Sequence, residues 1–247
     1  MTLEVVQFPC LSDNYGYLVR DQASGLVAAI DPPEAAPVQR ALDENGWRLS
    51  IIMNTHWHGD HIGGNAELAA PGVFIYGPAE VARKSGVDVV VADGDAVQLG
   101  ATKFSVIETG GHTLGHVSYH SAGDGLVFVG DTMFAMGCGR LFEGTAAQMW
   151  ASLSRLAALP PETLVYCAHE YTAANARFAL SVDRDNNVTR RAREIFVARE
   201  EGLATVPTTI GLERATNPFL RSPKLLPQLE PVEAFATIRT AKDGFIG

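Results

Sequence analysis

The sequence predicts an α/β domain followed by a smaller, mostly helical domain. Short apolar runs typical of buried strands alternate with helix-compatible segments up to about residue 170. Beyond that point, amphipathic helical patterns and a proline-rich stretch replace the alternation. We therefore predict two domains, 1–170 and 171–247.

The strand and helix signals of the first domain come from apolar runs and their stop signals. Strands are predicted at 3–8, 15–19, 26–30, 51–53, 73–76, 104–108, 117–120, 126–129 and 164–167, and helices at 34–44, 61–68 and 145–159. Pro9 stops the first strand, and Gly46 ends the first helix. Asp31 is expected to cap that helix in preference to acting as a carboxylate that hydrogen-bonds a metal ligand. Thr145 and Gln148 form a capping-box pattern.

The second domain shows helical periodicity at both of its ends. Residues 172–180 and 188–201 read as helices, and Gly202 stops the second of them. After Pro207 the sequence is irregular around Asn217, and 233–241 is expected to form a closing helix.

The composition fits a large core and excludes some partners. The chain has 247 residues, 47% of them hydrophobic, and a formal net charge of -9. Nucleic-acid-binding surfaces are normally basic, so we expect no nucleic-acid partner. The sequence shows no signal-peptide pattern and no run long enough to span a membrane. A monomeric, cytoplasmic protein with no membrane partner is expected.

Cysteine usage also indicates a reducing compartment. The three cysteines, Cys10, Cys138 and Cys167, are odd in number and form no CxxC pair. We expect buried free thiols in place of disulfides.

The most informative stretch is THWHGDHIGGN at residues 55–65. It places His56, His58, Asp60 and His61 on the loop between a buried strand and a helix-compatible segment. In extended backbone, His56 and His58 project to the same side, and Gly59 lets the chain turn afterwards. Imidazoles and a carboxylate at this density predict a metal site rather than a polar loop that merely caps a helix.

Three further candidate ligands, His112, Asp131 and His169, each lie just past the end of a predicted strand. Singly, each could be a loop histidine, a turn former or a helix cap. Together with the first four they make seven ligands, more than one ion uses. The count predicts two divalent cations that share one carboxylate; zinc is expected, with iron or manganese as alternatives.

HWHGDH resembles the HxHxDH motif of the metallo-β-lactamase superfamily. The resemblance implies a metallo-β-lactamase-like αββα sandwich with the smaller helical domain appended. It also implies that one metal is held by His56, His58 and His112, the other by Asp60, His61 and His169, with Asp131 bridging. The role of His116 is left open, with a hydrogen bond donated to a metal ligand as one possibility.

Two neighbouring cations predict hydrolysis. Water bound between them loses a proton near neutral pH, and the resulting hydroxide can attack an acyl carbon. Asp60 or Asp131 can orient this nucleophile or relay its proton. No GxSxG elbow is present, so acyl-enzyme chemistry is not expected.

Several outer segments resemble glyoxalase II, the hydroxyacylglutathione hydrolases. They are GCGRLFEG at 137–144, HEYT at 169–172, NPFLR at 217–221 and IRTAKDGF at 238–245. The resemblance implies a catalytic domain over 1–170 and a glutathione-binding domain over 171–247. It implies that Arg140, Tyr171, Arg239 and Lys242 bind glutathione. Family members often have Tyr where this chain has Phe142, and Lys where it has Arg140. These differences bear on whether glutathione or another thiol carrier is preferred.

The implied reaction is the hydrolysis of S-D-lactoylglutathione to glutathione and D-lactate, the second step of methylglyoxal detoxification. Three alternatives stay open at this point. They are a glutathione persulfide dioxygenase with one iron, a lactonase- or nuclease-like metallohydrolase, and a non-catalytic metal-binding module. The net acidity argues against a nuclease, and the helical tail favours the hydrolase over the dioxygenase.

Overall fold

The computed structural model describes residues 2–246 and divides them into two compact units. The first unit comprises the chain up to Glu108 together with Gly115–Gly130. The second comprises Thr109–Leu114 and the chain from Asp131 onward. The segment 109–114 therefore belongs to the second unit although it connects two strands of the first. The functional division near residue 170 stays a prediction.

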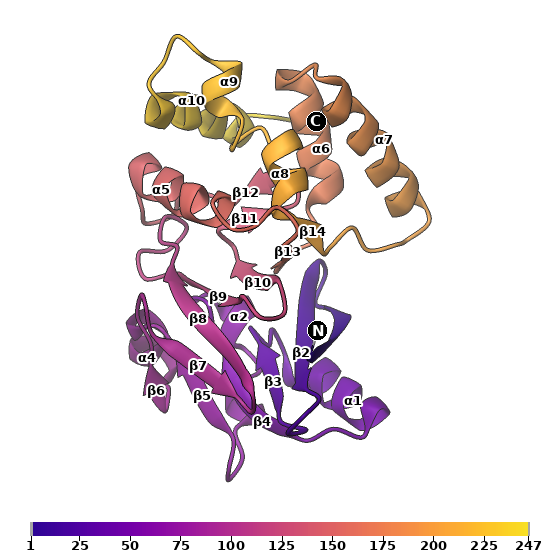
Figure 1. The fold of residues 1–247 in the computed structure, drawn as a ribbon, viewed down its shortest axis with the longest axis vertical. Coiled ribbons are helices and arrows are strands. Elements are labelled where there is room, and N and C mark those ends of the chain that lie inside the picture. Colours follow the sequence, from indigo (N-terminus) through magenta and orange to yellow (C-terminus); the bar gives the residue numbers. More distant parts are fainter. Residues whose placement is uncertain (1, 247) are drawn as a thin grey trace. The chain divides into compact units, whose positions relative to one another are not determined.

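Two sheets form the first unit (Figure 1). One contains, in spatial order, β1 (Leu3–Cys10), β2 (Asn14–Asp21), β3 (Val27–Ile30), β4 (Leu49–Met53), β5 (Phe74–Gly77) and β6 (Val89–Val90). The pairs β1–β2 and β2–β3 are antiparallel, and the rest are parallel. In the other sheet, β10 (Leu126–Gly130), β9 (Val117–Ser121), β8 (Thr102–Glu108) and β7 (Ala96–Leu99) lie side by side and antiparallel.

The core of the first unit lies between these layers. Tyr17 on β2 and Phe128 on β10 pack with ring centroids 5.4 Å apart, which joins the inner faces of the two sheets. Helix α1 (Ala35–Asn45) covers the first sheet with Val38 and Leu42. It ends at Gly46, as predicted, because that residue adopts a φ of 64°.

Three expectations for the first unit are wrong. β1 continues through Pro9, because it is an edge strand where a missing N–H is tolerated. Asp31 does not cap α1, whose N-cap position is Glu34. The helix expected at 61–68 is split into α2 (Gly59–Ile62) and α3 (Asn65–Leu68). The Gly64 N–H donates to the Pro32 carbonyl oxygen at 2.9 Å instead of continuing the helix. A Cβ at Gly63 would lie 2.3 Å from the carbonyl oxygen of Pro33, so this close approach requires glycine.

The second unit contains helices around short strands. Its elements are β11 (Met133–Phe134), β12 (Gly137–Cys138), α5 (Ala146–Ala157), β13 (Leu164–Cys167), α6 (Thr172–Val182), α7 (Asn186–Glu200), β14 (Thr208–Thr209), α8 (Ile210–Thr216), α9 (Ser222–Leu225) and α10 (Pro231–Asp243). Phe178, Phe219, Phe235 and Trp150 form an aromatic chain through its interior, with successive ring centroids 5.9–6.1 Å apart.

All four predicted helices of the second unit are present, as α5, α6, α7 and α10. The capping box at Thr145 and Gln148 is confirmed, and it opens α5. Helix α7 begins two residues before the predicted start because Asp185 accepts a hydrogen bond from the Asn187 N–H. The stretch after Pro207, expected to be irregular, contains α8 and α9. These two helices are too short to produce a periodic pattern.

Candidate functional site

The histidine-rich stretch follows β4 and leads into α2, so it lies on the predicted strand-to-helix loop. His56 and His61 are fully buried, and their ring centroids are 4.0 Å apart. The Nδ1 of His58 lies 3.1 Å from the Nε2 of His56. Three imidazoles of the first unit therefore converge at the end of β4, where their nitrogens are close enough to serve as metal ligands.

Asp31 belongs to this cluster. From the sequence, a carboxylate beside a metal ligand was the second choice for this residue, after a helix cap. Its carboxylate accepts hydrogen bonds from the N–H and the hydroxyl of Thr55 at 2.7 and 2.6 Å, and lies 3.1 Å from the Nδ1 of His61. A carboxylate on one ring nitrogen fixes which nitrogen is available to a metal. The sequence signal was its position directly after β3, which pairs in parallel with β4 through Ile30 and Met53.

Asp60 and His116 flank the same cluster. The side chain of Asp60 is 38% exposed, accepts a hydrogen bond from the Asn14 amide at 3.1 Å and lies 3.6 Å from the Nε2 of His61. His116 is fully buried and stacks on His56 with ring centroids 4.8 Å apart. The stack identifies His116 as a packing partner of a candidate ligand.

The other three candidate ligands meet in the second unit. Asp131 follows β10, His169 follows β13, and His112 lies in the segment 109–114. One carboxylate oxygen of Asp131 is 3.3 Å from the Nε2 of His112, and the other is 3.3 Å from the Nε2 of His169. The carboxylate thus presents one oxygen to each imidazole, as a group shared by two cations would.

Both imidazoles of this unit are held in orientation. The Nδ1 of His112 donates to the backbone oxygen of Arg140 at 2.8 Å, which leaves its Nε2 available for a metal. His169 stacks on Tyr171 with ring centroids 4.7 Å apart and an angle of 3° between planes. The edge contact of Phe134 with His169, at 5.8 Å, supports the same ring.

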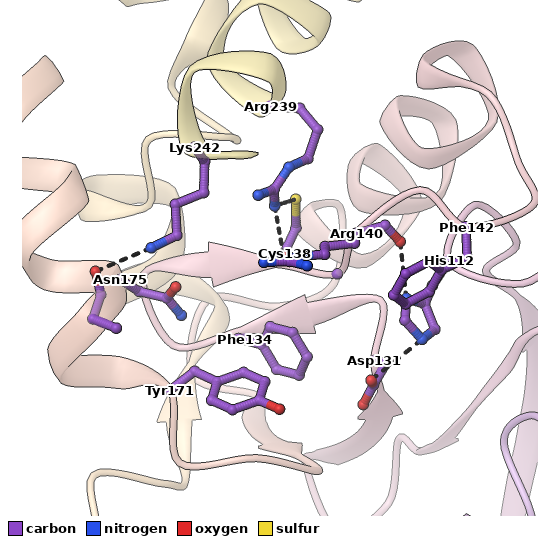
Figure 2. A pocket seen from close by; sticks show the side chains of 12 residues that line it. His112, Asp131, Phe134, Cys138, Arg140, Phe142, Tyr171, Asn175, Arg239 and Lys242 are labelled. Atoms are coloured by element: carbon purple, nitrogen blue, oxygen red, sulfur yellow. Dashed lines mark hydrogen bonds and ion pairs between the residues drawn. The ribbon is translucent and has the colours of Figure 1, made fainter. Parts of the chain in front are cut away.

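A pocket of about 460 Å³ opens beside this triplet, entirely within the second unit (Figure 2). It is lined by His112, Asp131, Phe134, Cys138, Gly139, Arg140, Phe142, Tyr171, Ala174, Asn175, Arg239 and Lys242. All four side chains predicted to bind glutathione are among them. The structure thus brings them together with two candidate ligands, although they come from distant parts of the sequence.

Two pocket cations come from α10 and are held differently. Arg239 and Lys242 are three residues apart and therefore share one face of the helix, from which both project into the pocket (Figure 2). Arg239 is buried; it donates to the backbone oxygen of Cys138 at 3.0 Å and lies 4.9 Å over the Phe219 ring. Lys242 donates to the backbone oxygen of Ala174 at 3.2 Å.

Burial and neighbouring positive charge both perturb the lysine of the pocket. Burial lowers the pKa of Lys242 below its ordinary value, and the guanidinium groups of Arg239, Arg177 and Arg140 lower it further, while Asp243 partly compensates. Such a concentration of positive charge in an acidic protein suits a ligand with more than one carboxylate.

All three cysteines lie among the described residues; they are buried and form no disulfide, as predicted. Burial raises the pKa of Cys10 and of Cys167 to about 12, and that of the pocket residue Cys138 to about 11 despite the nearby Arg239. These thiols stay protonated at neutral pH, so none is a thiolate nucleophile.

The donor sets fit metal ions. In the first unit, ligand atoms of Asp31, His56 and His61 lie within 4.8 Å of one another. Imidazole nitrogen and carboxylate oxygen suit zinc, iron and manganese alike. Sequence reasoning ranked the role of Asp31 in the first cluster second and missed Phe134 and Asn175 in the pocket, because these roles arise only from tertiary neighbours.

The fold and this donor pattern define a protein of the metallo-β-lactamase class. The sequence matches the profile described as Metallo-beta-lactamase superfamily over residues 17–169 and the profile described as Hydroxyacylglutathione hydrolase C-terminus over residues 170–245. A hydroxyacylglutathione hydrolase of Methylococcus capsulatus is 51% identical over 99% of this chain and 100% of the relative. One of Erythrobacter litoralis is 50% identical over 98% and 100%. The chain belongs to the hydroxyacylglutathione hydrolase family.

Solved structures agree on the fold. ETHE1 from Myxococcus xanthus superposes with a TM-score of 0.72 at 29% identity, over 97% of this chain and 90% of that one. TTHA1623 in a di-iron-bound form gives 0.63 at 27% identity, over 88% and 100%. Within residues 2–246, no helix has the length and apolar character needed to cross a membrane.

Proposed function

We propose that this chain is a thioester hydrolase that cleaves S-D-lactoylglutathione, and related S-2-hydroxyacylglutathiones, to glutathione and the hydroxy acid. The observation that carries the proposal is the pocket in which Arg140, Arg239 and Lys242 lie with His112 and Asp131. Glutathione has two carboxylates, which guanidinium and ammonium groups bind through charge-assisted hydrogen bonds. Relatives about 50% identical over their full length carry the name of this activity.

The proposed cofactor is a pair of divalent cations, zinc in preference to iron or manganese. We assign His56, His58 and His112 to one ion, Asp60, His61 and His169 to the other, and Asp131 to both. The proximity of His56 to His58 in the first unit, and of Asp131 to both His112 and His169 in the second, supports this assignment. When bound, such ions lower the pKa of water and stabilise negative charge on an acyl oxygen.

The residues of the chain supply the remaining tasks. Arg239 and Lys242 hold the glutathione carboxylates, and Arg140 and Tyr171 contact the peptide beside them. Asp60, the more exposed of the two catalytic carboxylates, orients the attacking water and receives its proton. The leaving thiolate needs no general acid, because a thiol is a much stronger acid than an alcohol.

The test is a substrate panel with purified, metal-loaded protein. We expect release of glutathione from S-D-lactoylglutathione, with little turnover of a homoserine lactone or of lactoyl-coenzyme A. Oxygen consumption with glutathione persulfide and one iron per chain would instead identify a dioxygenase, and lactone turnover a lactonase. Asp131→Ala, which removes the proposed bridge, should lose metal and activity together.

We also propose that residues 1–170 form the catalytic domain, that 171–247 form the glutathione-binding domain, and that the protein acts as a cytoplasmic monomer. Light scattering on the purified chain tests the monomer, and fractionation of the source cells tests the location.

A further inference from the structure

A strained hairpin lies under the pocket of the second unit. β11 and β12 pair through Met133 with Cys138 and Phe134 with Gly137, so the turn consists of Ala135 and Met136. Met136 has a φ of 56°, a left-handed conformation that residues with side chains rarely adopt. Such a turn persists only where its surroundings hold it.

Side chains from the helices hold this turn by its backbone. The N–H of Met136 donates to Glu213 Oε2 at 2.9 Å. The amide of Asn217 donates to the carbonyl oxygens of Phe134 at 3.3 Å and Gly137 at 2.9 Å. The amide of Asn175 donates to the carbonyl oxygen of Ala135 at 3.1 Å. The backbone N–H and C=O groups of this short hairpin are thus hydrogen-bonded by side chains of neighbouring helices rather than by further strands.

Glu213 and Asn217, which hold the turn, are themselves fixed by buried hydrogen bonds. Asn217 donates to Glu213 Oε2 at 2.9 Å, and both are fully buried. Glu213 also pairs with the guanidinium of Arg191 and accepts from the Thr208 hydroxyl at 2.7 Å. Burying charged and polar side chains costs free energy unless they are hydrogen-bonded. Because these side chains are hydrogen-bonded to one another, the network favours a single arrangement of Glu213 and Asn217.

The hairpin in turn contacts proposed metal ligands and proposed glutathione-binding residues of the pocket. The Phe134 ring packs edge-on against His169 at 5.8 Å and Tyr171 at 5.3 Å. The Cys138 carbonyl accepts from Arg239, and two residues later the Arg140 carbonyl accepts from a candidate metal ligand. One segment therefore sets the positions of proposed metal ligands and of proposed glutathione contacts.

We infer that Glu213 and Asn217 are positioning residues, which hold the 133–138 hairpin in the one conformation that shapes the glutathione pocket. The inference rests on the proposed function for the identity of the ligand. Neither residue touches the pocket, so their effect on binding passes through the hairpin.

The test compares Asn217→Ala with Arg221→Ala. Arg221 lies in the same NPFLR segment and is similarly buried, but its bonds run to Asp183, Asp185 and the Ala215 carbonyl rather than to the hairpin. Two readouts are used well below both melting temperatures: amide hydrogen exchange of peptides covering 131–140, and calorimetric binding of S-methylglutathione, a thioether that cannot be hydrolysed.

Asn217→Ala is expected to speed exchange of the hairpin amides and to raise the Kd by about tenfold, with KM raised more than kcat is lowered. Arg221→Ala should leave the exchange rate and the Kd within about twofold of the wild-type values, even where it lowers stability as much as Asn217→Ala does. Equal effects of the two variants, or none from Asn217→Ala, would overturn the inference. If Asn217→Ala does not fold, Asn217→Ser and Glu213→Gln repeat the comparison. A wild-type protein that fails to bind S-methylglutathione refutes the proposed function, while hydrogen exchange still decides the role of Glu213 and Asn217.

Discussion

Replacing Lys242 by Met should separate binding from stability. The methionine keeps the apolar stem and removes the ammonium, which donates to the Ala174 carbonyl and lies 5.4 and 5.5 Å over the rings of Phe178 and Phe245. Losing these contacts costs about 1 kcal/mol for the hydrogen bond and about 0.5–1 kcal/mol for each ring. Relief of the burial and repulsion that lower the pKa of Lys242 acts in the opposite direction. We expect the unfolding free energy to fall by less than about 2–3 kcal/mol, which the lost contacts alone would cost.

Substrate binding should respond much more strongly. A charge-assisted hydrogen bond to a carboxylate contributes about 1.5–3 kcal/mol, so Lys242→Met should raise KM for S-D-lactoylglutathione about 10- to 150-fold with little change in kcat. The pH dependence adds a second check. Because its pKa is lowered, the lysine loses its proton at lower alkaline pH than an ordinary lysine, so the wild-type KM should rise there while that of the variant stays flat. An unchanged KM in a normally folded variant would refute the assignment of Lys242 to the substrate.

Three further predictions follow from single side chains. Asp31→Asn should weaken metal binding by about 10- to 100-fold in chelator competition, because the carboxylate orients His61; unchanged affinity would contradict that role. Phe142→Tyr should lower KM about fivefold by restoring a hydroxyl, roughly 1 kcal/mol, at the pocket mouth; a higher KM would show that the hydroxyl finds no partner. Asp21→Asn should cost about 2 kcal/mol at pH 7, because hydrogen bonds, first that of the Ser24 hydroxyl, lower the pKa of Asp21. The stabilisation is present above the ordinary carboxyl pKa and is lost as pH falls through the lowered one, so denaturant melts should show the difference shrinking below about pH 4.

Local patterns made most of the fold predictable. The histidine loop was predictable because an apolar strand precedes it and Gly59 within it lets the chain turn, all within about a dozen residues. The start of α5 was predictable because Thr145 and Gln148 satisfy each other at the helix end. Local sequence patterns of this kind can be recognised without knowing which residues from distant parts of the sequence lie nearby.

The features that were missed depend on contacts between distant residues. Asp31 reads as a cap until β3 is seen beside β4. Gly63 reads as part of a helix until the Pro33 carbonyl is seen against it. The β11–β12 hairpin has two residues per strand and a strained Met136, so it is recognisable only with Glu213 and Asn217 in place. In each case tertiary contacts override local propensity.

The most direct test of the proposed mechanism is a crystal structure of the metal-loaded protein with anomalous diffraction at the metal edge. We predict two peaks, with Asp131 bonded to both and three imidazole or carboxylate partners on each from the seven assigned ligands. A single peak, or two peaks that do not share Asp131, would contradict the binuclear centre.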